Sequence, residues 1–203
     1  MIILPNECLF ETFTYLKNWD LFSCLLVNRQ WCRIAIPLLW RELSLFRSKK
    51  LVRTCLLILN TEEQSSLKTF ITFPNNQKPL FDYTAYTMVI KIDSDNGIMR
   101  LFENNSHNFN FSNYHAQLIA AKLIRYTLTK MFLRTSKKLK DLSIHCEIVN
   151  SLLSRIFDKC TLTSLTLSHN GLGTEGGNVL AEVLHKNTTL THLYIWGNKL
   201  DSQ

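Results

Sequence analysis

Three glycines in this chain, Gly171, Gly173 and Gly176, have the spacing G-x-G-x-x-G. Between a strand and a helix, this spacing lets backbone amides approach the pyrophosphate of a dinucleotide. Such a site also needs an acidic residue about twenty residues later, at the end of a second strand, to bind the ribose. The stretch in that place is THLYIWGN, which has no carboxylate. We therefore predict that the glycines form a strand-to-helix turn and bind no cofactor.

The cysteines and histidines do not indicate catalysis or a metal site. The six cysteines include no C-x-x-C pair, and the six histidines have no Cys or Asp at motif spacing. The sequence also lacks G-x-S-x-G, P-loop and H-E-x-x-H motifs. We therefore predict no catalytic residue, no metal ligand and no cofactor, so that the protein is not an enzyme. His169 and His192 are expected at the edge of a strand or on the surface.

The apolar segments of the chain are short. The first residues, MIILPNECLF, lack the basic and long apolar segments of a secretory signal. No apolar run approaches the roughly eighteen residues of a membrane-spanning helix. We expect a protein of the cytoplasm or nucleus, without a membrane partner, whose cysteines are reduced thiols.

The net charge of +7 is unevenly distributed. Residues 44–138 carry fourteen basic and six acidic groups, an excess of +8, whereas residues 1–43 have four of each and residues 139–203 have five and six. A cluster of Arg134, Lys137, Lys138 and Lys140 could contact phosphate or nucleic acid. No aromatic platform for bases accompanies it, so a solvated helix end is the favoured interpretation.

The first 43 residues are too apolar for a segment of their size. Of these residues 26 are apolar, about 60%, compared with 46% for the whole chain. The spacing predicts one helix with Pro5 at its first position and a second over residues 18–27. It predicts a third that contains Trp31 and stops at Pro37, which interrupts helical hydrogen bonding. Three helices of this length have little interior. The apolar surplus therefore either packs on the rest of the chain or forms a docking surface for another protein.

Residues 4 to 43 resemble an F-box. The matching positions are Leu4-Pro5, Glu7, Leu9, Phe13, Tyr15-Leu16, Asp20-Leu21, Val27, Arg29, Trp31, Ala35, Pro37 and Leu39-Trp40. The resemblance implies a three-helix module that binds a Skp-type adaptor and, through it, a cullin–RING ubiquitin ligase. Thr12 and Lys17-Asn18 depart from the family pattern, and we expect these departures to weaken adaptor binding. The residues expected to bind the adaptor are Leu4, Pro5, Leu9, Phe13, Leu16, Leu21, Leu25, Val27, Trp31, Pro37, Leu39 and Trp40.

The last third of the chain repeats itself. LTSLTLSHNGL begins at Leu162 and a matching copy, LTHLYIWGNKL, begins at Leu190, while Leu139, Leu142 and Ile144 form a degenerate copy upstream. The form L-x-x-L-x-L-x-x-N-x-L resembles a leucine-rich repeat of the ribonuclease-inhibitor-like class. It implies short parallel strands with inward leucines and an inward asparagine that bonds the backbone of the bend. The residues expected to bind a protein target, on the concave side, are Thr163, Thr166, His192, Tyr194 and Trp196.

The segment between these two regions has weaker patterns. We predict helices over residues 51–59, after Thr61, and over residues 115–134, with a strand over residues 87–93 and a turn at residues 95–97. Residues 74–79 and 104–113 are predicted to be loops, the latter exposed.

No helix follows Leu200 to cover the last repeat, so we expect a natural chain with more repeats, a truncated gene product, or a partner that covers this edge.

These observations predict an α+β or α/β chain made of a three-helix F-box (1–43), a mostly helical linker (44–138) and a short leucine-rich-repeat solenoid segment (139–203). The resemblances imply the substrate-recognition subunit of an SCF-type ubiquitin ligase, with the Skp-type adaptor at one end and an unknown protein target at the other. One alternative is a scaffold with the same two modules that acts outside ubiquitin ligation. A less favoured alternative is a nucleic-acid-binding protein that uses the basic middle segment.

Overall fold

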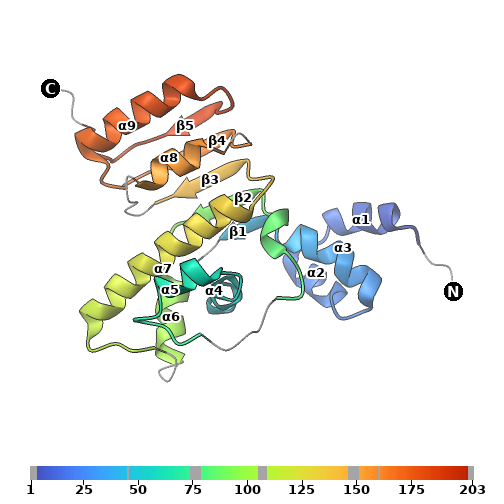
Figure 1. The fold of residues 1–203 in the computed structure, drawn as a ribbon. Coiled ribbons are helices and arrows are strands. Elements are labelled where there is room, and N and C mark those ends of the chain that lie inside the picture. Colours follow the sequence, from blue (N-terminus) through green and yellow to red (C-terminus); the bar gives the residue numbers. More distant parts are fainter. Residues whose placement is uncertain are drawn as a thin grey trace.

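The computed structural model describes residues 4–44, 46–73, 79–104, 109–145, 151–159 and 161–200. It has two parts, an N-terminal bundle of three helices and an array in which parallel strands alternate with helices (Figure 1). Each part has its own cluster of buried apolar side chains. The three-helix segment and the α/β segment therefore agree with the predicted fold class.

The bundle consists of α1 (Asn6–Thr14), α2 (Asn18–Cys24) and α3 (Arg29–Leu39). Its core contains Phe13, whose ring lies 5.1 Å from that of Trp31 in an edge-to-face arrangement. Asn28 caps α3, because its side-chain oxygen accepts a hydrogen bond from the Trp31 amide at 2.9 Å. The buried members of this core are Leu9, Phe13, Leu21, Cys24 and Ala35.

The prediction that the third helix stops at Pro37 is wrong, because α3 continues to Leu39. Proline removes one backbone donor and crowds the carbonyl four residues earlier. Here it falls in the last turn of the helix, next to Ala35 and Ile36, which are both buried. Packing at these two residues favours a helical backbone around the proline. The second helix is shorter than predicted and passes through turns from Leu25 to Val27.

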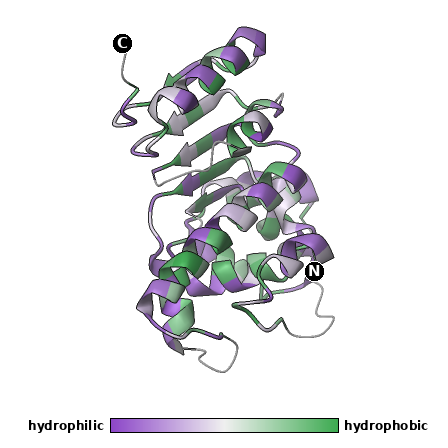
Figure 2. Ribbon diagram, turned by 60° about the vertical axis from the view of Figure 1, so that its left-hand side comes forward, coloured by the Kyte–Doolittle hydropathy of each residue, from purple (hydrophilic) through white to green (hydrophobic). Residues whose placement is uncertain are grey.

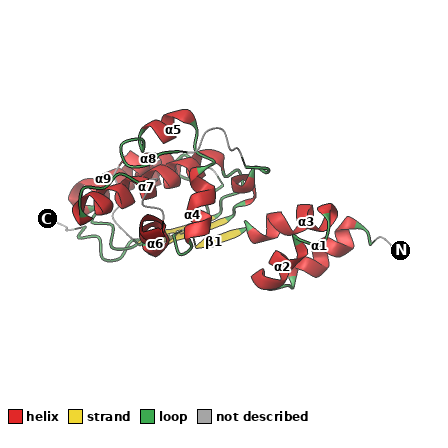
Figure 3. Cartoon of the chain, turned by 90° about the horizontal axis from the view of Figure 1, so that it is seen from below, coloured by secondary structure: helices red, strands yellow, loops and turns green. Residues whose placement is uncertain are grey.

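The array is built on one sheet of five parallel strands in chain order, β1 (Glu42–Ser44), β2 (Val89–Ile92), β3 (Asp141–Ile144), β4 (Ser164–Leu167) and β5 (His192–Tyr194). The segments that connect them contain α4 (Lys49–Leu56), α5 (Thr61–Ser65) and the 3₁₀ helix η1 (Tyr83–Tyr86), then α6 (Asn96–Asn104) and α7 (Tyr114–Thr135), then α8 (Ser151–Phe157), and last α9 (Gly173–Lys186). Figure 3 shows α7, α8 and α9 gathered on one side of the strands. The segment predicted as a linker (44–138) thus supplies β2 and the last residue of β1 to the same sheet.

The strand register follows the repeat seen in the sequence. Leu165 pairs with Leu193, the matching leucine of the next copy, and Leu142 of the degenerate copy pairs with Leu165. Leu43 and Ile90 extend the same inward line onto β1 and β2, although neither lies in a recognisable repeat. This pairing is consistent with the resemblance to leucine-rich repeats.

Two buried asparagines close the bends after β4 and β5. Asn170 and Asn198 are each 2% exposed, and the Asn170 amide donates to the Asn198 side-chain oxygen at 2.7 Å. The Asn170 side chain also donates to the Ile144 carbonyl at 2.8 Å, which links the bend after β4 to the end of β3. Gly171 and Gly173 follow with φ of +62° and +60°, a conformation that favours glycine. Gly171 thus lies in the predicted turn between β4 and α9, whereas Gly173 begins α9 and Gly176 lies within it.

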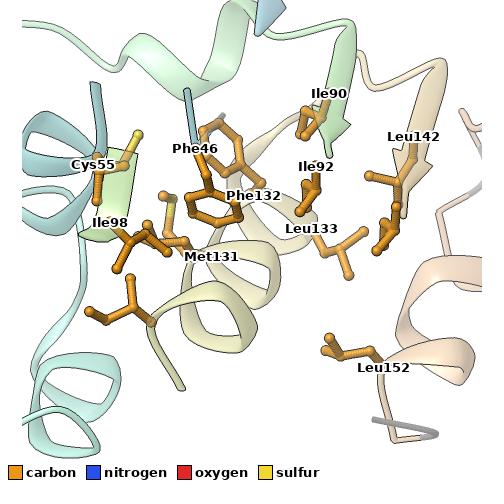
Figure 4. Close-up of a cluster of buried hydrophobic side chains, with 14 of the residues drawn as sticks. Phe46, Cys55, Ile90, Ile92, Ile98, Met131, Phe132, Leu133, Leu142 and Leu152 are labelled. Atoms are coloured by element: carbon orange, nitrogen blue, oxygen red, sulfur yellow. The ribbon is translucent and has the colours of Figure 1, made fainter. Parts of the chain in front are cut away.

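The main core lies between the inner face of the sheet and α7, with α4 and α6 around it (Figure 4). Ile90 and Ile92 of β2 lie on the side of Phe132 and Leu133 of α7, whereas Met131 lies beside Ile98 of α6, and all six are buried. The helices of the array carry hydrophobic and hydrophilic bands, as expected where one side packs on a core (Figure 2). Near the beginning of α7 Leu118 is exposed, whereas Ala121, Ile124 and Leu128 further along the helix are buried.

Two predictions for the middle segment are wrong. Residues 95–97 do not form an isolated turn but contain the beginning of α6, and the amide of Gly97 donates to the Phe46 carbonyl. Residues 104–113 are not simply an exposed loop, because Phe109 is buried and its ring lies 5.1 Å from that of Phe102. The aromatic side chains outweigh the surrounding asparagines, since burying them removes a large apolar area from water. Some of the predictions concern residues outside the described ranges. These are most of the predicted loop at residues 74–79, part of the asparagine-rich segment, Cys146 and Cys160.

Candidate protein-binding surfaces

The outer face of α2 is the first candidate surface. Trp19, Phe22 and Leu26 follow one another at helical spacing and are 86%, 62% and 85% exposed. The opposite face of α2 places Leu21 and Cys24 in the bundle core, so the helix cannot bury both faces. We call Trp19, Phe22 and Leu26 the α2 surface. Trp19 and Phe22 lie on α2 and Leu26 lies in the turn that follows it. Three large apolar side chains this exposed within eight residues are typical of a contact with another protein.

Further exposed apolar residues lie around the same bundle. The Gln30 side chain donates to the Asn6 side-chain oxygen at 2.9 Å and so holds the beginning of α1 against the beginning of α3. Leu4, just before α1, and Val27, just before α3, therefore lie at the same end of the bundle, and both are exposed. Phe10 is also exposed.

The twelve residues predicted to bind the adaptor divide into three groups. Leu4, Pro5 and Val27 are exposed, and Leu9, Phe13 and Leu21 are buried in the bundle core. The remaining six are half-buried: Leu16, Leu25, Trp31, Pro37, Leu39 and Trp40. The buried members shape the helices that carry the surface. The predicted set does not include the α2 surface. The sequence signal that could have found it is that Phe22 and Leu26 do not share the apolar face of their helix.

Trp40 has a role that the sequence could not assign. Its ring stacks on that of Tyr83 in η1, with centroids 4.6 Å apart and planes 21° from parallel. Arg41 follows, and its carbonyl accepts hydrogen bonds from the amides of Met88 and Val89 at 2.9 and 3.0 Å. Only Trp40 and Arg41 separate α3 from β1. The bundle is therefore fastened directly to the array by a ring stack and two backbone hydrogen bonds.

The outer face of the sheet is the second candidate surface. Sheets made only of parallel strands usually have both faces covered. Here the inward residues of the first four strands are buried, whereas the outward residues of the five strands are half-buried or exposed. We call this outward side the open sheet face. A parallel sheet with one uncovered face offers its strands to a partner as a continuous surface.

The five predicted target-binding residues lie at the β4 and β5 end of the open sheet face. Thr166 pairs in register with Tyr194, which is more than half exposed. Trp196, also more than half exposed, lies just past β5, and its ring meets that of His169 edge-on at 4.2 Å. Thr163 and His192 are exposed as well. The structure thus gathers these residues at one end of the face, with two aromatic rings at its edge.

Charges occupy the other end of the open sheet face. Lys91 on β2 pairs with Glu42 on β1, and this hydrogen bond raises the pKa of Lys91. A hydrogen bond from Arg47 lowers the pKa of Asp93, which follows β2. With Asp141 on β3, these positions hold three carboxylates and two cations. The face therefore carries none of the positive excess of the chain and is a poor surface for nucleic acid.

Metal-ligand groups and reactive thiols are the remaining chemical features to consider among the described residues. Among them, His, Cys, Asp and Glu nowhere form a group of three or more that could hold a metal ion. Cys55 is fully buried in the main core, and burial raises the pKa of its thiol, which disfavours the nucleophilic thiolate. Within the same ranges, no helix combines the length and apolar character needed to cross a membrane.

The structure thus presents two candidate surfaces, one on a small helical module and one on a face of parallel strands. Residues 1–46 match the family model described as F-box-like. The chain thus carries an F-box-like domain that includes the three-helix bundle. No curated protein matches the sequence.

Proposed function

We propose that the chain is the substrate-recognition subunit of an SCF-type ubiquitin ligase. The observation that carries the proposal is the α2 surface, because it leaves a domain that matches the F-box-like family with large apolar side chains in water. A Skp-type adaptor would cover it, with Leu4 and Val27 at the edge of the contact. Tryptophan is enriched among the residues that contribute most to binding, so Trp19 is the best candidate for the centre.

The adaptor contact is tested by co-purification of the full chain with a Skp-type adaptor. We expect Phe22→Asp with Leu26→Asp to abolish the complex, since two carboxylates would be buried against an apolar partner. Both residues are exposed, so the bundle should remain folded, which circular dichroism checks. Arg33→Ala, an exposed position on α3, is the matched control. Full adaptor binding by the double variant would contradict this placement of the contact.

The target contact is assigned to the open sheet face, and leucine-rich repeats are the module that best accounts for it. The arrangement of leucines, buried asparagines and parallel strands supports this class. Tyr194 and Trp196 supply aromatic anchors, and Thr163, Thr166 and His192 supply hydrogen-bonding groups beside them. Targets are identified by affinity purification and mass spectrometry while the proteasome is blocked. Unchanged affinity for an identified target in both Tyr194→Ala and Trp196→Ala would contradict the assignment.

In this proposal the chain makes and breaks no bond itself. It holds a target near the ubiquitin thioester that the ligase supplies, and the gain in rate comes from effective concentration. Reconstitution of the complex with an identified target distinguishes this role from that of a scaffold. Ubiquitin transfer that depends on Phe22 and Leu26 supports a ligase subunit, whereas stable binding without transfer supports the scaffold.

A further inference from the structure

A cavity on the helical side of the array is lined mainly by cations. It has a volume of about 270 Å³. Its walls come from the C-terminal half of α7, from the end of α8 and from the two residues that follow α8. Its lining residues are Lys130, Leu133, Arg134, Arg155, Asp158 and Lys159. We call it the α7–α8 pocket.

Two of the cations are paired with carboxylates of α5 that do not line the pocket. Arg134 donates through its Nε and one terminal nitrogen to both oxygens of Glu63, at 3.0 and 2.8 Å. Glu63 is itself fixed, because it is buried and forms a capping box with Asn60. Lys130 contacts Glu62 at 3.3 Å. These contacts orient the two cations, so that less side-chain entropy is lost when an anion binds.

The oriented cations keep hydrogen-bond donors that their carboxylates do not use. A guanidinium has five N–H donors and an ammonium has three. Arg134 uses two of its donors on Glu63, and Lys130 uses one on Glu62. Arg155 is exposed and has no hydrogen-bond or ion-pair partner in the part of the chain that the structure describes. Unused donors from two helices thus converge on one cavity.

The charge around the pocket remains positive after the carboxylates are counted. Four cations and Asp158 line the pocket, and Glu62 and Glu63 pair with two of those cations from outside the lining. These groups together leave an excess of one positive charge. Lys159 donates to the carbonyl of Ser136 at 3.1 Å, and the exposed Lys137 and Lys138 follow Ser136 directly. They raise the excess to three at this end of α7. The basic cluster seen in the sequence therefore borders a cavity.

We propose that the α7–α8 pocket binds a phosphate monoester. Such a group carries nearly two negative charges and three acceptor oxygens, which suits several converging cations better than a single carboxylate does. Arginine binds phosphate through two parallel hydrogen bonds, and Arg155 is available for this role. Nucleic acid fits less well, because the lining contains no aromatic side chain on which a base could stack. The site is independent of the adaptor and target surfaces.

The test is fluorescence anisotropy with the full chain and a short labelled Gly/Ser peptide that carries one phosphoserine. We expect binding of this peptide and none of its unphosphorylated counterpart. Arg155→Gln should weaken binding about ten- to a hundredfold, as expected for lost hydrogen bonds between charged groups. Arg33→Gln removes the same charge from the bundle and is the matched control. Equal affinity in the Arg155 and Arg33 variants would overturn the proposal.

A second variant gives a change of the opposite sign. Asp158→Asn removes the carboxylate of the lining and should strengthen binding roughly two- to tenfold, whereas Glu7→Gln in the bundle should not. Competition by inorganic phosphate at the peptide's own concentration would indicate that the site binds free phosphate, and a clear preference for the peptide would indicate a phosphorylated protein. Both results support the proposal. A single-stranded oligonucleotide that binds where the phosphopeptide does not would overturn it.

Discussion

The stack of Trp40 on Tyr83 should determine how firmly the F-box-like domain is held against the array. Tyr83→Ala removes two ring contacts, with Trp40 at 4.6 Å and with Phe81 at 5.7 Å. Each aromatic pair contributes about 0.5–1.5 kcal/mol beyond the area that it buries. Only the pair with Trp40 crosses the junction, because Phe81 and Tyr83 both belong to the array. The variant should therefore lower the free energy of opening this junction by about 0.5–1.5 kcal/mol.

Hydrogen exchange measures that opening at two amides. Met88 and Val89 donate to the Arg41 carbonyl, so their amides exchange when the junction separates. In Tyr83→Ala they should exchange about two- to tenfold faster, which is the same free energy expressed as a ratio of rates. The amide of Thr166 on β4 lies in another part of the sheet and should keep its protection.

Tyr83→Phe is the matched control, because it keeps both ring contacts and removes only the hydroxyl. It should exchange like the parent chain at Met88 and Val89. If Tyr83→Ala and Tyr83→Phe exchange alike at these amides, the ring stack does not fasten the domain and the reasoning is refuted. In a reconstituted ligase, we expect Tyr83→Ala to bind the adaptor normally and to transfer ubiquitin more slowly, since a loose spacer lowers effective concentration.

Three further predictions concern stability. Gly97→Ala should lower the free energy of unfolding by about 1–3 kcal/mol, because the added Cβ would overlap the Phe46 carbonyl. Gly177→Ala should be tolerated, because its Cβ would meet only the flexible Leu200 side chain. Thermal unfolding of the two variants compares these costs. Asn198→Ala should cost about 1–3 kcal/mol in a urea titration, because buried backbone groups lose their partner, and a cost no greater than that of Thr166→Ala would contradict this. Arg47→Gln should change how stability depends on pH: the hydrogen bond from Arg47 lowers the pKa of Asp93, so its contribution is present above the ordinary aspartate pKa and is lost as pH falls through the lowered value. Parent and variant should therefore converge in acid, and a constant difference down to about pH 2 would count against the pairing.

The local pattern was sufficient where a segment repeats or where its side chains have one clear apolar face. The spacing of the repeats became the register of β3, β4 and β5, because matching leucines must share one face of a sheet. The long helix α7 was predicted almost to its ends, since its hydrophobic period extends over several turns. The glycine turn was also predictable, because the acidic residue of a dinucleotide site is missing.

The pattern was insufficient where packing between distant segments decides the structure. Pro37 stays inside α3, and Phe109 is buried among asparagines, because neighbouring side chains pack around them. Leu43 and Ile90 have no repeat around them, yet they extend the line of leucines on β3 and β4. A strand of three or four residues has little signal of its own, and its place depends on the strand beside it.

The sequence by itself determined that the first segment has more apolar side chains than three short helices can bury, and that the last segment repeats. Only the tertiary structure decided which of those side chains remain in water, since Leu9 and Phe13 fill the bundle core and Trp19 and Leu26 do not. It also brought Arg134 of α7 and Arg155 of α8 to one cavity. The composition of a segment determines how many apolar and charged side chains it has. The geometry of packing determines which of them are buried and which are exposed.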